Sequence, residues 1–379
     1  MSLTNIRLTP QGIEVGMPQE AALAILDGQG PAPKTWWEFQ NLSAALWLRE
    51  RTEEALFWAN VAFEAQRAVS TCINMAVILE SLARLDEALV YARMAYQTDP
   101  TDERAAQCYG EHLLRQGFFS AGWVLYCQAR ANDNFSKLQD LLPEWTGQDL
   151  KSKRLLIVGY GGYGDNFYFM HMFPKLREMG ADITYAGHPP IQSIVEHQGY
   201  KVARNLQDRL DFKFYDYYST IFSLGMKLDW SLTNPLWPGP YIRAPRSWRL
   251  RWGIGVCFQA GEASSPRKTR NMSFSQRTKI VRAVGDRIVD FTYTKFTNWL
   301  DTAKALSRLD LLVTVDTGVA HLAGAMGIPV WVILPGASAW HYPVGYTYHP
   351  FYPTMRLFWS QHEGMDDAVD DCVKALQWK

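Results

Sequence analysis

A glycine-rich segment, Gly159-Tyr-Gly-Gly-Tyr-Gly164, directly precedes Asp165 and follows an apolar run that ends at Val158. Its spacing fits the GxGxxG pattern, in which glycines let a dinucleotide approach the backbone. That pattern also needs an acidic residue about 20 residues further on, but the next apolar run is followed by His188. The segment is therefore only a weak candidate for a dinucleotide-binding site. On this loop alone, Asp165 is a better helix cap than a general base.

A second motif with chemical potential is the turn Asp316-Thr317-Gly318, which joins the apolar run LDLLVTV to a predicted helix over 318–326. The start of a helix presents unpaired N–H groups and a positive dipole end, which suit a diphosphate. Asp316, beside it, is placed to accept hydrogen bonds from sugar hydroxyls. The structural alternative is that Asp316 or Thr317 only caps the helix and that His321 only packs in the core.

A third motif is the cationic loop PRKTRNMS, at 266–273, which follows a predicted strand. Arg267, Lys268 and Arg270 are candidates to neutralise a leaving diphosphate, because guanidinium and ammonium groups form charge-assisted hydrogen bonds with phosphate oxygens. The alternative interpretation is a solvated charged face.

The first half of the chain contains a repeat. TEEALFWANVAFE, at 52–64, and LDEALVYARMAYQ, at 85–97, align at an offset of 33 residues and share alanines at equivalent positions. The period is close to that of the tetratricopeptide repeat, about 34 residues, in which small residues let helices approach closely. We expect three helix pairs from about Thr35 to about Asn134, the third a degenerate copy at Gly117 to Ala129, with a capping helix before them. Chance similarity within a helical bundle is the alternative.

From Pro143 onward, apolar runs alternate with helical segments, which predicts βαβ units and parallel sheets. One series begins with the strand at 154–158 and the other with RWGIGVCFQAG at 251–261, and a proline-rich segment, Pro235 to Pro245, separates them. Ligands bind beyond the carboxyl ends of parallel strands, where all three motifs fall. We therefore expect two Rossmann-like lobes with a ligand cleft between them. Helices are predicted at about 165–179, 190–198, 275–284, 298–307, 318–326 and 365–376.

These residues carry a resemblance. The segment from about Gly117 to Gln361 resembles the tetratricopeptide-linked members of the heptosyltransferase-like family, glycosyltransferase family 9, which have a GT-B fold and kinship to O-GlcNAc transferases. It rests on GxxxxGWxxY, LLIVGYGGYGDNFYF, VDTGVAHLAGAMGIPVWVILP and YPTMRLF. The resemblance implies that Asp165 activates the acceptor and that the turn starting at Asp316 binds the sugar and diphosphate of the donor. Phe258 replaces the usual tryptophan, and the lobes are shorter, so ADP-heptose is not carried over as the donor.

The composition argues against several other classes of protein. Of the 379 residues, 38 are Lys or Arg and 38 are Asp or Glu, so no global field favours nucleic acid or an anionic membrane. Five cysteines without metal-binding spacing and the lack of a secretory pattern at the N-terminus favour buried thiols in a cytoplasmic protein. The apolar stretch from Leu311 to Leu334 is interrupted by Asp316, His321 and Pro329, which indicates a soluble core rather than a membrane span.

We therefore predict an α plus α/β chain. It has a TPR-like helical domain at 1–142, an acceptor-side lobe at 143–245 and a donor-side lobe at 246–379. The predicted activity is that of an inverting, metal-independent glycosyltransferase, with a nucleotide sugar as co-substrate and no further cofactor. Asp165 is the predicted base. The candidate donor-binding residues are Gly164, Gln259, Lys268, Arg270, Asp316, Thr317, Gly318, Val319 and His321.

The acceptor and two alternative functions stay open at this point. A protein, a saccharide, a small molecule or a modified nucleic acid fits as acceptor, and the repeats offer a surface for a protein partner or a second copy of the chain. The first alternative is an inactive binding protein that acts through its repeats. The second is an NAD(P)-dependent oxidoreductase that uses the glycine-rich loop.

Overall fold

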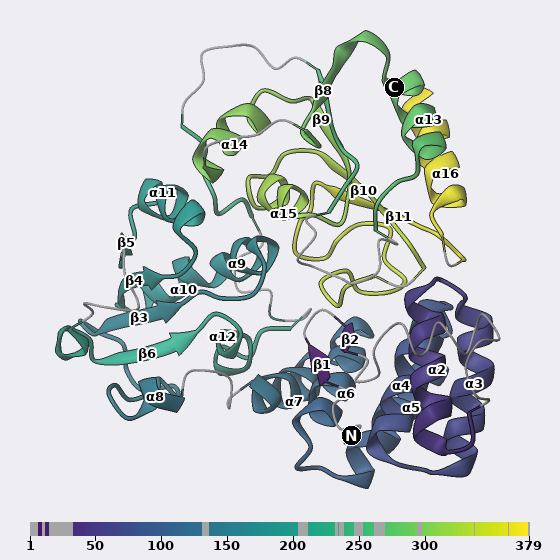
Figure 1. Cartoon of the computed structure of the whole chain (residues 1–379). Coiled ribbons are helices and arrows are strands. Elements are labelled where there is room, and N and C mark those ends of the chain that lie inside the picture. Colours follow the sequence, from purple (N-terminus) through teal and green to yellow (C-terminus); the bar gives the residue numbers. More distant parts are fainter. Residues whose placement is uncertain are drawn as a thin grey trace.

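The computed structural model describes residues 7–9, 12–14, 33–130, 136–203, 211–231, 234, 239–245, 253–260, 270–293, 298–336, 338–362 and 364–377. Figure 1 shows an N-terminal helical array beside two α/β lobes. Two short strands, β1 (Arg7–Thr9) and β2 (Gly12–Glu14), pair antiparallel near the N-terminus. The expected capping helix, Arg267 and Lys268 lie outside the described residues.

The helical array confirms the predicted repeats. Its helices follow one another as three pairs with short turns. Alanines that the repeat alignment matched, among them Ala55, Ala59, Ala88 and Ala92, are buried where the helices meet, because a methyl side chain allows close approach. The pairs are α2 (Trp36–Leu48) with α3 (Thr52–Ala65), α4 (Val69–Ser81) with α5 (Leu85–Thr98), and α6 (Glu103–Arg115) with α7 (Phe119–Arg130).

The first lobe contains a parallel sheet of order β5-β4-β3-β6. The single helix predicted at about 165–179 is wrong in one respect, because it is divided into α9, η1 and α10. Pro174 lies in the first turn of α10 and lacks the N–H needed to continue the preceding helix. The elements are β3 (Arg154–Val158), α9 (Tyr163–Phe169), η1 (Met170–Met172), α10 (Phe173–Glu178), β4 (Asp182–Ala186), α11 (Pro189–His197), β5 (Lys201–Val202), η2 (Phe212–Phe214), β6 (Tyr217–Thr220) and α12 (Ser223–Lys227), and the short α8 (Ser136–Gln139) precedes them.

The second lobe contains a parallel sheet of order β11-β10-β9-β7-β8. Two parallel sheets after a helical array confirm the predicted fold class, repeats followed by paired Rossmann-like lobes of the GT-B type. The elements are β7 (Ile254–Cys257), α13 (Phe274–Val284), η4 (Gly285–Arg287), β8 (Ile288–Asp290), α14 (Trp299–Leu306), β9 (Leu311–Val315), α15 (Gly318–Ala325), β10 (Val330–Leu334), β11 (Met355–Trp359) and α16 (Asp366–Gln377).

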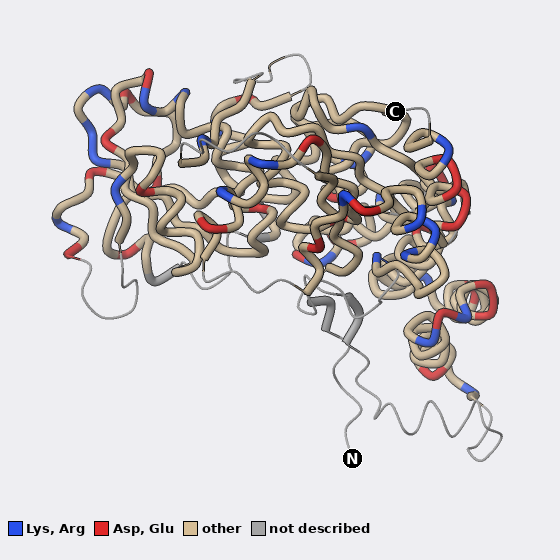
Figure 2. Tube along the Cα trace, turned by 90° about the horizontal axis from the view of Figure 1, so that it is seen from above, with Lys and Arg blue, Asp and Glu red and all other residues tan. Residues whose placement is uncertain are grey.

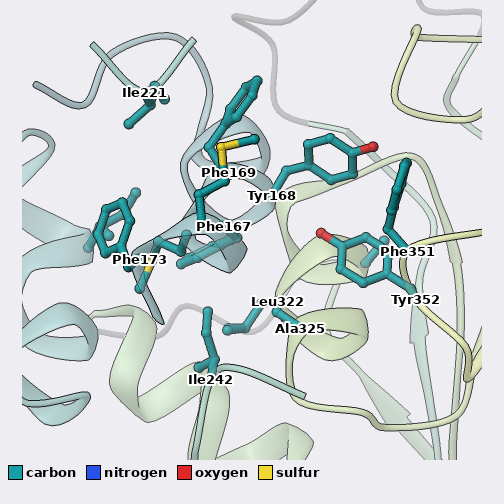
Figure 3. Close-up of a cluster of buried hydrophobic side chains, with 14 of the residues drawn as sticks. Phe167, Tyr168, Phe169, Phe173, Ile221, Ile242, Leu322, Ala325, Phe351 and Tyr352 are labelled. Atoms are coloured by element: carbon teal, nitrogen blue, oxygen red, sulfur yellow. The ribbon is translucent and has the colours of Figure 1, made fainter. Parts of the chain in front are cut away.

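One apolar core joins the third helix pair to both lobes. Trp123 of α7 stacks on Trp230 of the first lobe, with 5.4 Å between ring centroids, and packs edge-on against Trp340 of the second lobe at 5.2 Å. Figure 3 shows Tyr168 of α9 beside Tyr352, with ring centroids 5.8 Å apart. The third helix pair is therefore part of the core of the lobes rather than a detached module.

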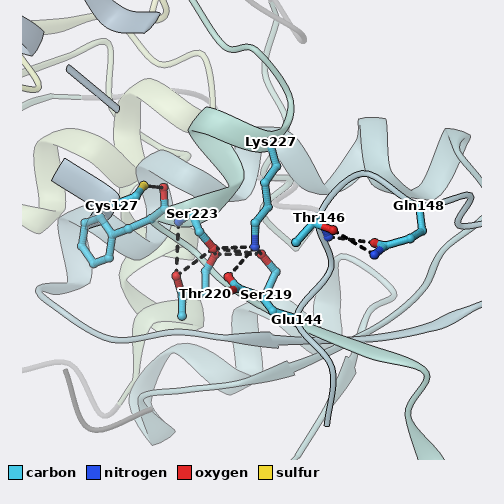
Figure 4. Close-up of polar contacts among 9 residues, drawn as sticks. Cys127, Glu144, Thr146, Gln148, Ser219, Thr220, Ser223 and Lys227 are labelled. Atoms are coloured by element: carbon cyan, nitrogen blue, oxygen red, sulfur yellow. Dashed lines mark hydrogen bonds and ion pairs between the residues drawn. The ribbon is translucent and has the colours of Figure 1, made fainter. Parts of the chain in front are cut away.

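A buried lysine side chain binds the connector between the helical array and the first lobe to that lobe (Figure 4). Lys227 of α12 lies 2.5 Å from Glu144 and also donates to Ser219 and Ser223. Burial lowers the pKa of Lys227 from its ordinary value. The connector between α8 and β3, which contains Glu144 and Trp145, thus lies along the edge strand β6, where the backbone N–H of Trp145 donates to the carbonyl of Tyr218.

Lys and Arg positions are interspersed with Asp and Glu positions along the described trace in Figure 2. Among the described residues, no helix is both long and apolar enough to cross a membrane. The five cysteines are thiols. Cys127 of α7 is half-buried rather than buried as predicted.

We expect acid to destabilise the core through His171. This side chain packs 4.5 Å from Trp230, and burial lowers its pKa from 6.5 to about 4. Between these two pH values, the His171 imidazole therefore binds a proton in the unfolded chain but not in the folded chain. As the pH falls from about 6.5 to 4, the free energy of unfolding should decrease by up to about 1.4 kcal/mol per unit from this group.

The measurement is the melting temperature between pH 7.5 and 4.5. His171→Phe should reduce the slope of its pH dependence, whereas His197→Phe, at an exposed position, should leave the slope unchanged. Some slope should remain in His171→Phe, because burial also lowers the pKa of His321. Equal slopes for the wild type and His171→Phe would contradict the prediction.

Candidate functional site

The strand orders place the sequence motifs at the switch points of the two sheets. In the first lobe β3 lies between β4 and β6, and the glycine-rich segment follows β3. In the second lobe β7 lies between β8 and β9. Arg270 follows β7, and Asp316 follows β9. Ligands of open α/β sheets bind where neighbouring connections leave on opposite faces, so the topology directs these motifs to ligand-binding positions.

Asp165 caps its helix and makes a second contact as well. It is the third residue of α9, and its Oδ2 accepts a hydrogen bond of 2.7 Å from the N–H of Gly162. Gly161 makes the turn with a φ of 77°, a value that favours glycine. The other carboxylate oxygen, Oδ1, lies 2.8 Å from Nε2 of His341, and the Asp165 side chain stays 20% exposed. Asp165 is therefore more than a helix cap, because its carboxylate also meets the second lobe and can be reached from solvent.

The partner of Asp165 comes from the other lobe. His341 lies in the segment after β10, its side chain is 10% exposed, and its ring stacks on Trp340 at 3.8 Å. The sequence interpretation missed His341, because the segment AWHYP matches no motif. The usable signal was its position after a predicted strand, at the same sheet edge as Asp316.

Arg270 and Asp316 form a buried ion pair. The guanidinium lies 2.6 Å from Asp316 Oδ2, and the two side chains are 18% and 5% exposed. Burial raises the pKa of Asp316, but the Arg270 guanidinium and the nearby imidazoles of His321 and His341 together outweigh burial, so the net shift of the pKa is downward. The cation predicted to neutralise a diphosphate is therefore paired with the residue predicted to contact the sugar.

The N-terminus of α15 lies beside this ion pair. Thr317 is the N-cap, and its hydroxyl accepts from the N–H of Ala320 at 3.2 Å. Gly318 and Val319 occupy the first helical positions, whose N–H groups have no acceptor within a helix. Two aromatic side chains that the sequence interpretation did not select stand next to Gly318: Tyr163, which is 40% exposed, and Trp299, with ring centroids 5.2 Å apart.

His321 and Gly164 bring the lobes together. A Cβ atom on Gly164 would lie 2.8 Å from Cδ2 of His321, so only glycine allows α9 to approach α15 this closely. His321 Nε2 lies 3.8 Å from Asp316, and burial lowers the pKa of His321 to about 3. The imidazole is neutral at pH 7, so it packs and accepts or donates hydrogen bonds without adding positive charge.

The structure thus brings together Asp165, Arg270, Asp316 and His321. His341 lies between Asp165 and His321, 2.8 Å from the Asp165 carboxylate and with its ring centroid 5.0 Å from that of His321. Gln259 is exposed at the end of β7. His188 Nε2 lies 2.8 Å from the carbonyl of Gly161, where a dinucleotide site would hold an acidic residue. A groove of about 740 Å³ between the turn at Ala83 and the second lobe is lined by none of the predicted site residues.

Comparisons with known proteins give distant similarities. No protein-family model matches the chain. It is 22% identical over 310 residues to Protein FlbA of Caulobacter vibrioides, a match that covers 67% of this chain and 51% of FlbA. The chain therefore spans about half the length of this curated relative.

Among solved structures, the chain is similar to a glycosyl transferase of family 9 from Veillonella parvula, with 13% identity, 57% of this chain and 88% of that chain covered, and a TM-score of 0.38. It is also similar to a mutant O-GlcNAc transferase of Thermobaculum terrenum, with 10% identity, coverage of 95% and 88%, and a TM-score of 0.36. These are the protein classes that the sequence motifs resemble.

Proposed function

We propose that the protein is an inverting glycosyltransferase that uses a nucleotide-sugar donor. The observation that carries the proposal is the contact between the lobes at Gly164 and His321, which sets Asp165 close to the N-terminus of α15. A base and an anion-binding helix end thereby share one site. Among the described residues these two features come from different sheets, as a reaction between an acceptor and a donor requires.

In the proposed reaction, Asp165 takes the proton of an acceptor hydroxyl as the acceptor oxygen bonds to the anomeric carbon. The bond from that carbon to the diphosphate oxygen breaks on the opposite face, and its electron pair leaves with the nucleoside diphosphate. The N–H groups of Gly318 and Val319 and the Arg270 guanidinium stabilise the leaving charge. Asp316, released from Arg270, contacts the sugar hydroxyls. The proposal assigns no step to a metal ion.

Lys268, Gln259 and Val319 complete the proposed donor site, and the exposed ring of Tyr163 offers an aromatic face to the donor. The five free thiols fit a reducing compartment, so we propose that the reaction takes place in the cytoplasm.

The direct test is ligand-induced thermal stabilisation. A nucleoside diphosphate at 100 times its dissociation constant should stabilise the folded chain by about 2.7 kcal/mol, and UDP, GDP and ADP are the probes. The matching monophosphates should have smaller effects, because they lack the second phosphate for the end of α15. Stabilisation by NAD or NADP instead would favour an oxidoreductase, and no shift with any nucleotide would overturn the donor site.

A further inference from the structure

Arg115 holds both ends of the segment that carries His341. It is the last residue of α6, and its side chain is 6% exposed. Its Nε donates to the carbonyl of Ser338 at 2.9 Å, while its own carbonyl accepts from the N–H of Val344 at 3.1 Å. Arg115, a residue of the helical array, therefore forms hydrogen bonds to both ends of the segment 338–344, one before and one after His341.

The guanidinium is itself fixed by the preceding helix pair. Oε2 of Glu80 in α4 lies 2.6 Å from Nη1 of Arg115, and a buried guanidinium needs such a partner to offset its desolvation. The third helix pair adds a further contact, because Trp340 packs edge-on against Trp123 of α7 at 5.2 Å and stacks on His341. Three helices of the array thus fix this segment of the second lobe.

We propose that Arg115 is a positioning residue of the transfer reaction: by holding segment 338–344 it keeps His341 against Asp165, so the helical repeats set the geometry of the base. The inference rests on the proposed function of Asp165. Its physical basis is preorganisation, since a displacement of about 1 Å at a catalytic group costs up to about 10²-fold in rate. The repeats then control turnover even for an acceptor that does not touch them.

The test uses a double variant, Glu80→Gln with Arg115→Met, which removes both charges and leaves no isolated buried ion. We expect kcat for donor hydrolysis or transfer to fall at least about 10-fold, with the donor KM within about twofold, because the contacts at α15 are untouched. The single variant Arg115→Lys keeps a cation beside Glu80, so its kcat should lie between those of the double variant and the wild type. Ser43→Ala is the matched control, because it removes a buried hydrogen bond to Ala55 in the first helix pair and should lower the melting temperature without changing kcat.

A second readout does not depend on activity. The imidazole resonance of His341, identified by its loss in His341→Gln, should shift in the double variant and stay in place in Ser43→Ala. An inactive wild type would overturn the proposed function alone, because the resonance still reports whether Arg115 holds the segment. An unmoved resonance, or a double variant whose folded fraction keeps full kcat, would overturn this inference.

Discussion

Asp165→Asn should lower turnover by about 10²-fold or more, the usual scale of a general base, while leaving nucleoside diphosphate binding intact. The amide keeps the shape of the side chain, and its oxygen still accepts from the N–H of Gly162, so the helix cap survives. What it lacks is a basic oxygen for the acceptor proton. The measurement is the initial rate of nucleoside diphosphate release, with and without acceptor, together with calorimetric titration of the diphosphate.

The matched control is Asp182→Asn, which removes a carboxylate from the same lobe at an exposed ion pair with Lys201. Exposed pairs contribute about 1 kcal/mol or less, so this variant should keep wild-type turnover. If Asp165→Asn also keeps it, Asp165 is only a cap, and the mechanism needs another base.

Asp316→Ala should have the second large effect, and it should separate two ligands. It leaves the Arg270 guanidinium buried without its carboxylate, which typically costs about 3 to 5 kcal/mol of unfolding free energy. The freed guanidinium and the loss of repulsion should let a nucleoside diphosphate bind as well as before or better. A nucleotide sugar should bind more weakly, because the contacts to its hydroxyls are lost. Chemical denaturation and titration calorimetry of both ligands measure these quantities.

The control is the double variant Asp316→Ala with Arg270→Met, which removes both charges. It should recover much of the lost stability and lose affinity for the diphosphate and the nucleotide sugar alike. Equal losses for both ligands in the single variant Asp316→Ala would contradict the sugar-binding role.

The sequence predicts the parts of this fold that have a local pattern. The repeated alanines, such as Ala59 and Ala92, predict the helix pairs, and the apolar runs at β3, β9 and β10 predict the central strands. The strands β6, β8 and β11 were not predicted. The first reads YYST and the second has only three residues, so neither gives a long apolar run, and β11 was seen only as the motif YPTMRLF.

The site was also predictable only in part, because only some of its residues belong to a local sequence pattern. Asp165 and Asp316 follow strong strands, and the carboxyl ends of parallel strands are where ligands bind. The pairing of Arg270 with Asp316, of His341 with Asp165, and of Arg115 with the carbonyl of Ser338 joins segments far apart in sequence. Such contacts follow from how the lobes and the third helix pair pack, and no local pattern encodes them.

The shared core determines how the protein can be divided for expression. A fragment that begins at residue 143 would lack Trp123, and the faces of Trp230 and Trp340 that this ring covers would be open to water. Such a contiguous aromatic surface favours aggregation. A transferase fragment that stays in solution therefore has to begin before α6, and under our inference before α4, which carries Glu80.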